Sequence, residues 1–303
     1  MDRNEYSNAL AEVCFLEDML RKPGLSMLTS KSMEFRLNKI KKDIATLKEK
    51  VSKPARAVIT YRGAPVVGSF GVLAEFGANA TRAFSDAVAA VAASLTGTLS
   101  DKGPIPNKPN NQLLITGTAL GSFGFVLEES PTNSQLQLGG ETAVQQALEL
   151  IVDLLEASTG SDEELSEPVS QLANRAISSV VEFLTELANS EASCALTTNH
   201  KKFKFVDASQ VKISKARLSI DNIKEENPSF SGMFTGVLPE RRAFEFRTES
   251  GETIHGSIRK EIEQPSAIND YLGKHVTITL HSRMVGESKP RYAISELPWQ
   301  AQN

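Results

Sequence analysis

The chain has 303 residues, of which 40% are hydrophobic and 23% charged, with a formal net charge of −4. This length predicts two or three domains, and this composition excludes wholesale disorder. The sequence lacks an apolar run of about 18 residues and a signal peptide, so we expect no membrane span and no secretion. Two distant cysteines, Cys14 and Cys194, indicate free thiols in a reducing compartment, and hence a cytoplasmic protein.

The first segment, residues 1–53, is predicted to form two helices separated by Pro23-Gly24 and ended by Pro54. In the second helix, apolar residues recur at alternating four- and three-residue steps, which makes a short heptad seam. The seam is short for an autonomous coiled coil, so the helices either close on each other as a hairpin or pair with a second chain. We expect self-association through the seam residues Met33, Leu37, Ile40, Ile44, Leu47 and Val51.

Residues 54–195 repeat one pattern twice. A strand, a turn, a second strand (66–76) and a helix (78–95) are followed by strands at 113–116 and 121–129 and a helix at 142–157. The word Gly-Ser-Phe-Gly occurs at 68–71 and again at 121–124. This predicts a duplicated ββα unit that forms one sheet with helices on one face, with Phe70 and Phe123 as equivalent core residues. A long acidic helix, capped by Ser161, is expected next, to about Leu187.

The C-terminal third is richer in predicted strands. Residues 196–228 predict a connector made of one strand (202–206) and one helix (208–223). Residues 229–303 predict five strands, at 232–238, 243–248, 253–260, 274–281 and 290–296, with a helical turn at 265–271. Such a segment suits a small five-stranded β-barrel of the OB or SH3-like type. The expected fold class is therefore α+β, with a helical hairpin, a duplicated ββα domain with acidic helices, and a barrel.

Candidate catalytic groups are sparse. The Gly-Ser-Phe-Gly words lack the spacing of a nucleophile elbow, and no Lys-Ser/Thr follows them as in a phosphate-binding loop. The four histidines, all after residue 199, have no Cys or acid at a spacing that completes a zinc set. Strand-end carboxylates at Glu75, Glu128 and Glu129 leave a metal-dependent enzyme as an open alternative. We predict no catalytic residue, no metal and no cofactor.

Nucleic-acid binding has broader support in the C-terminal third. Cations alternate with Phe203, Phe205, Phe244 and Phe246, a pattern typical of grooves for single strands. Residues 200–303 nevertheless carry nearly balanced charge, and an edge strand with one buried face shows the same alternation. The candidate contacts are Lys201, Lys202, Lys204, Arg241, Arg242, Arg259 and Lys260.

Two short words carry a further hint. The Arg-Gly-Ala-Pro-Val turn at 62–66 and the Gly-Ser-Phe-Gly-Phe word at 121–125 resemble those of prokaryotic proteins of unknown function. The resemblance implies a bacterial source, and accessory proteins of phage-defence or toxin systems are one setting for such chains. We therefore expect a non-catalytic interaction or scaffold protein, a subunit or accessory factor of a larger prokaryotic complex with protein partners. The alternative is nucleic-acid binding through the barrel and the adjacent basic strand.

Overall fold

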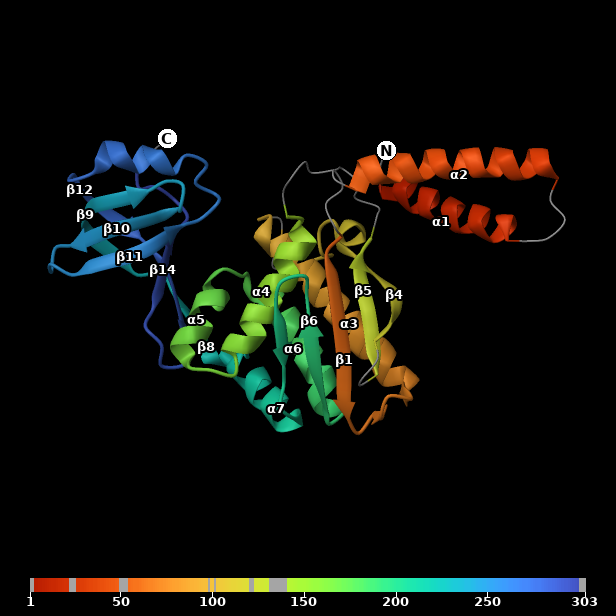
Figure 1. The fold of residues 1–303 in the computed structure, drawn as a ribbon. Helices are drawn as coiled ribbons and strands as arrows, with labels where there is room; N and C mark the ends of the chain where they lie inside the picture. Colours follow the sequence, from red (N-terminus) through yellow and green to blue (C-terminus); the bar gives the residue numbers. More distant parts are fainter. Residues whose placement is uncertain are drawn as a thin grey trace.

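The computed structural model describes residues 3–21, 26–48, 54–97, 99–100, 102–119, 123–130 and 141–299. These residues form a helical hairpin, a five-stranded sheet covered by helices, and a curled seven-stranded sheet (Figure 1). The predicted mixture of α and β structure is confirmed. Among the described helices, none combines the length and the apolar character that crossing a membrane requires.

The hairpin consists of α1 (Arg3–Leu20) and α2 (Met27–Lys48), which pack against each other. Leu16 of α1 and Leu37 of α2 are buried, yet they belong to neither of the two larger hydrophobic cores. Two ion pairs between described residues join the helices: Arg36 pairs with Glu12, and Lys41 Nζ lies 2.7 Å from Glu17 Oε1. The two helices therefore close on each other within one chain, which is the first of the two arrangements that the sequence left open.

The five-stranded sheet is antiparallel throughout, in the order β4–β5–β1–β6–β7. Alternate residues of the central strand β1, among them Ile59 and Tyr61, are fully buried and face the helices. The sequence did not predict β6, because its run Ala-Ser-Cys-Ala-Leu-Thr is short and built of small residues. The strands are β1 (Arg56–Gly63), β4 (Leu113–Ala119), β5 (Gly124–Glu129), β6 (Ala192–Thr197) and β7 (Lys202–Lys204).

One face of this sheet is covered by helices (Figure 1). They are α3 (Ala74–Leu95), α4 (Ala143–Ala157), α6 (Asn174–Asn189) and α7 (Ala208–Arg217). Helix α5 (Asp162–Ser170) instead packs between α4 and the curled sheet. Ser161 caps α5 in a capping box with Glu164, as the sequence predicted. The prediction of a single long acidic helix was wrong, because the helix is interrupted between α5 and α6. There the extended Ala173 donates its N–H to Ser94 Oγ of α3, at 2.8 Å.

The two predicted copies of the ββα unit differ in structure. The second copy forms the long hairpin β4–β5, whereas the expected strand 66–76 is only a small hairpin, β2 (Val66–Val67) and β3 (Gly71–Val72), before α3. Gly68 adopts a positive φ of 53°, and Phe70 N–H bonds to Val67 O, so the first Gly-Ser-Phe-Gly word makes a turn. Phe70 is 90% exposed, so its predicted place in the core was wrong, while Phe123 is half-buried beside Phe125.

The curled sheet follows the order β12–β9–β10–β11–β14–β13–β8. The five predicted strands lie within it, and the helical turn η4 (Pro265–Tyr271) stands between β11 and β12. Its interior is aromatic and aliphatic, with Phe234, Phe246 and Leu280 fully buried. The strands are β8 (Ile223–Glu226), β9 (Ser229–Leu238), β10 (Ala243–Thr248), β11 (Thr253–Ile258), β12 (His275–Thr279), β13 (His281–Val285) and β14 (Arg291–Ile294).

The joint between the curled sheet and the helices is built around one arginine. Arg283 of β13 is buried and donates to the carbonyl oxygen of Val169 (2.7 Å), near the end of α5, and to Asn174 Oδ1 (3.0 Å). Its Nε donates to Glu225 Oε1 of β8 at 2.6 Å. Burial raises the pKa of Glu225, but Arg283, Asn174 and His281 outweigh burial and hold the pKa below its usual value.

Candidate functional site

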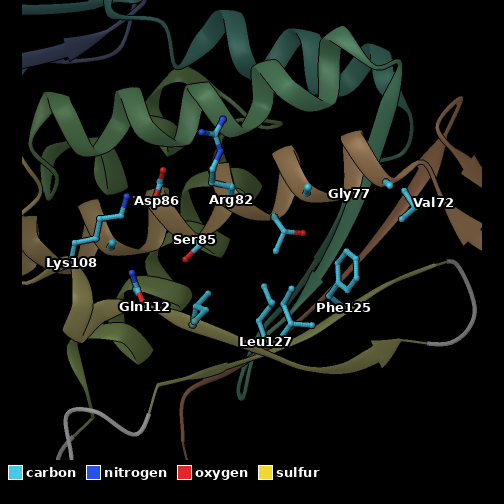
Figure 2. A pocket seen from close by; sticks show the side chains of 15 residues that line it. Val72, Gly77, Arg82, Ser85, Asp86, Lys108, Gln112, Phe125 and Leu127 are labelled. Carbon is cyan, nitrogen blue, oxygen red and sulfur yellow. Dashed lines mark ion pairs between the residues drawn. The ribbon is translucent and has the colours of Figure 1, made fainter.

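A cleft of about 660 Å³ opens between α3 and the β4–β5 hairpin (Figure 2). The wall from α3 is a single helical face of mostly small residues, including Gly77, Ala78 and Ser85, at steps of three and four. The opposite side is apolar, with Ile115 of β4 and Leu127 of β5 on the sheet face that looks toward α3. Small side chains on the helix and branched ones on the sheet leave a cleft with a hydrophobic floor.

Charged groups lie toward one end of the cleft. Lys108, from the short helix η1 (Lys108–Asn111), pairs with Asp86 of α3 at 2.7 Å. Arg82, one turn before Asp86, is exposed and has no hydrogen bond or ion pair with any residue that the structure describes. Its side chain points away from Phe125 and Leu127, so its guanidinium lies at the rim of the cleft and not at its floor (Figure 2). With two cations and one carboxylate, this end of the cleft carries an excess of positive charge. It can pair with an anionic group, whereas the floor favours apolar side chains.

The hairpin carries a second candidate surface. Phe15, Met27, Leu28 and Phe35 are 60%, 75%, 85% and 74% exposed. Phe15 and Leu28 line a groove of about 580 Å³ between the two helices. Monomeric proteins rarely expose several large apolar side chains together, so these four residues, called the apolar stripe below, are a candidate interaction surface.

Of the predicted self-association residues, the three whose side chains the structure describes lie toward the inside of the hairpin. Leu37 is buried, and Met33 and Ile40 are half-buried. The side chains of Ile44 and Leu47 and the whole of Val51 lie outside the described residues. The exposed stripe was missed because a heptad pattern identifies the face that packs against another helix, and not the residues that remain uncovered.

The predicted nucleic-acid contacts are distributed over two separate sheets (Figure 1). Lys201 pairs with Asp153 at 2.5 Å, and the Arg242 guanidinium donates to the carbonyl oxygens of Ile258 (3.0 Å), Arg259 and Ile262 (2.7 Å). Lys260 donates to Leu95 O at the end of α3, and Arg259 is half-buried. Lys202, Lys204 and Arg241 are exposed.

The aromatic rings that were expected to interleave with these cations do not form a stacking platform. Phe205 is buried under the five-stranded sheet, and Phe244 and Phe246 fill the interior of the curled sheet. Phe203 is half-buried beside Phe205. The alternation of Lys and Phe on β7 therefore reflects a strand with one buried face, the second interpretation that the sequence allowed.

The strand-end carboxylates have structural partners. Glu129 accepts a hydrogen bond from the Thr142 hydroxyl at 3.0 Å, which ties β5 to the start of α4. Glu128 lies 3.6 Å from Arg56, and Glu75 is exposed in the first turn of α3. Within the described part of the chain, no three His, Cys, Asp or Glu side chains are grouped so that they could hold a metal ion.

Two groups of the kinds that act as nucleophile or base, the Cys194 thiol and the His281 imidazole, have pKa values shifted by their surroundings. Burial raises the pKa of the Cys194 thiol to about 12, which keeps the thiol protonated at neutral pH. Burial, and then the nearby Arg259, lower the pKa of His281, whose Nδ1 lies 3.0 Å from Asn227 Oδ1.

Comparisons with protein-family models, with curated proteins and with solved structures find no match for this chain.

Proposed function

We propose that this protein is a non-catalytic interaction protein that assembles through its N-terminal hairpin, as a subunit or accessory factor of a larger complex. The observation that carries the proposal is the exposed apolar stripe of Phe15, Met27, Leu28 and Phe35 on a hairpin that shares neither hydrophobic core. Two helices have only one mutual interface, so their outer apolar residues need another layer to cover them. A surface of this kind binds protein rather than a small substrate.

A second copy of the hairpin is the partner that the charges favour. Helix α1 carries four Asp/Glu and one Arg, whereas α2 carries six Lys/Arg and two Asp/Glu. Within one chain these charges already pair, as Lys41 does with Glu17. Two hairpins that place α1 of one copy against α2 of the other repeat the same complementarity and form a four-helix bundle. Leu28 and Phe35, seven residues apart on one face of α2, would then lie in its core.

The double substitution Leu28→Ser with Phe35→Ser should halve the particle mass in solution, measured by light scattering after size-exclusion chromatography. It removes apolar area from the outer face and leaves Leu37 inside the hairpin. The matched control, Glu34→Gln with Asn38→Ser, changes two exposed α2 residues outside the stripe, removes no cation, and should leave the mass unchanged. A native chain that is monomeric at every concentration tested would contradict the proposal.

The topology of the curled sheet supports nucleic-acid binding as a second candidate. Leu280 N–H donates to Pro228 O at 2.9 Å, so pairing continues from β8–β13 into β9–β12. The seven strands thus amount to five continuous stretches along the chain: β8–β9, β10, β11, β12–β13 and β14. Around the sheet, these stretches pair in the order first, second, third, fifth, fourth and back to the first. The third and fifth, β11 and β14, are parallel. This is the order of a closed OB-type barrel, a class whose second and third strands often bind oligonucleotides.

Exposed cations on this barrel test the second candidate. Arg241→Glu with Arg247→Glu should abolish binding of a fluorescein-labelled oligothymidylate, and native affinity should fall by about 0.7 log units per log unit of salt for each phosphate neutralised. Arg242 is unsuitable as a test position, because its guanidinium donates hydrogen bonds to three backbone carbonyl oxygens and its replacement would disturb the fold. Binding that is independent of salt, or unchanged in the double variant, would exclude this candidate.

A further inference from the structure

The two edges of the five-stranded sheet differ in how they are protected. At one edge, β7 has only three residues, and two of them are the exposed Lys202 and Lys204. Short length and lysine side chains are common protections against pairing with another chain. At the other edge, β4 has seven residues, Leu-Leu-Ile-Thr-Gly-Thr-Ala, with no charge and no proline. Leu114 and Ile115 of β4 are 45% and 59% exposed, so this edge is long, neutral and apolar.

The backbone of β4 offers hydrogen-bonding groups at this open edge. Gln112 O accepts a bond from Ser130 N–H at 3.0 Å, so the backbone of Gln112 faces the partner strand. In an antiparallel pair the direction alternates, so the N–H and C=O of Leu113 and then Ile115 point away from β5. Among the described residues, no other strand pairs with β4 on that side. The open stretch ends at the shift in register after Ile115.

The cleft under α3 lies on the same side of β4 as the side chains of these residues. Leu113 pairs with Glu129, and Ile115 pairs with Leu127. Leu113 and Ile115 themselves both line the cleft. In a strand added beside β4, residues opposite Leu113 and Ile115 would direct their side chains to the same face. Every second side chain of such a strand would therefore enter the space between β4 and α3 (Figure 2).

We propose that the β4 edge and the α3 cleft together form a peptide-binding site that takes an extended segment by strand addition. The segment carries apolar side chains at alternate positions, for the hydrophobic floor, and a terminal acidic residue that pairs with Arg82 at the rim of the cleft. This mode of recognition obtains affinity from main-chain hydrogen bonds and specificity from pockets for alternate side chains. The site is separate from the hairpin and independent of self-association.

Two fluorescein-labelled peptides, Val-Thr-Val-Thr-Glu and its reverse, probe the site by fluorescence anisotropy on the full chain. We expect saturable binding of at least one. Ala78→Phe, which fills the cleft, and Ile115→Lys, which places a cation in it, should each weaken binding at least about tenfold. Arg82→Gln should weaken the Glu peptide but not its Gln analogue. Lys204→Gln, at the protected edge, is the matched control and should leave binding unchanged.

N-methylated peptides separate strand addition from simple side-chain capture. In a bound strand, every second backbone N–H group of the peptide faces β4. Methylation of that set of N–H groups should abolish binding, whereas methylation of the intervening N–H groups should preserve it. Equal binding of both methylated series, or no saturable binding of either parent peptide, would overturn the proposal. So would a lower particle mass for Ile115→Lys, which would assign the edge to a second copy. The Leu28→Ser, Phe35→Ser chain should bind the peptides normally whatever its mass.

Discussion

Replacing Arg283 by Ala should lower the free energy of unfolding by about 3–5 kcal/mol, the cost typical of breaking a buried ion pair by removing one partner. The Arg283 side chain is only 7% exposed, and its guanidinium connects α5, α6 and two strands of the curled sheet. Its loss leaves the Glu225 carboxylate without its main partner and the carbonyl oxygens at the end of α5 without a donor. Urea unfolding followed by circular dichroism measures the change.

Arg291 on the neighbouring strand β14 provides the matched control. It also reaches α5, through Glu163 and Glu167, but its side chain is 38% exposed. Arg291→Ala should therefore cost only about 0–1 kcal/mol. A loss as large as that of Arg283→Ala would show that burial of the charge does not decide the effect.

The ion pair between Arg283 and Glu225 makes the free energy of unfolding depend on pH. The folded pKa of Glu225 lies below its usual value of 4.5, so its contribution is present above that pH and is lost as the pH falls through the folded pKa. The difference in stability between native chain and Arg283→Ala should shrink in that acidic range. A difference that stays constant as Glu225 becomes protonated would contradict this assignment.

Gly124→Ala should cost about 3 kcal/mol or more, because an added Cβ cannot be accommodated between the two central strands. The Cβ would lie 2.0 Å from Ile59 O and 2.6 Å from Thr60 Cα, both backbone atoms of β1. Relief would require β5 to separate from β1. We expect the protein to express poorly or to unfold at a much lower temperature, as measured by differential scanning calorimetry.

Gly117, on the other strand of the same hairpin, is the control. A Cβ there would meet only the Val126 side chain, at 3.8 Å, which is ordinary contact. Gly117→Ala should therefore change stability by no more than about 1 kcal/mol. If both variants lost stability equally, glycine content rather than close approach to β1 would be the cause.

Local patterns explain why most elements were predictable. Helix α2, the capping box at Ser161 and the five predicted strands of the curled sheet each depend on residues near in sequence, and the described structure contains them. The repeated Gly-Ser-Phe-Gly word misled because the same four residues make a turn at 68–71. Whether a phenylalanine in such a word is buried depends on the strands around it, and around Phe70 these are only β2 and β3, of two residues each.

Tertiary contacts explain what the sequence could not reveal. The break between α5 and α6 is stabilised by Arg283, more than 100 residues later, and no periodicity marks such a contact. The cleft was equally hidden, because it depends on the separation of α3 from β4 and on the place of β4 at a sheet edge. One signal was available: a strand of seven residues without charge or proline is unusual at an edge.

The position of β1 has a consequence for how the chain folds as it is synthesised. Thr60 pairs with Gly124 on one side and with Ala195 on the other, so β1 acquires its second neighbour only after residue 197 has left the ribosome. Such high contact order slows folding, whereas α3 can form from local contacts at once. Until β6 arrives, a strand destined for the centre of the sheet presents an unpaired edge, and this interval is when the nascent chain most needs protection from aggregation.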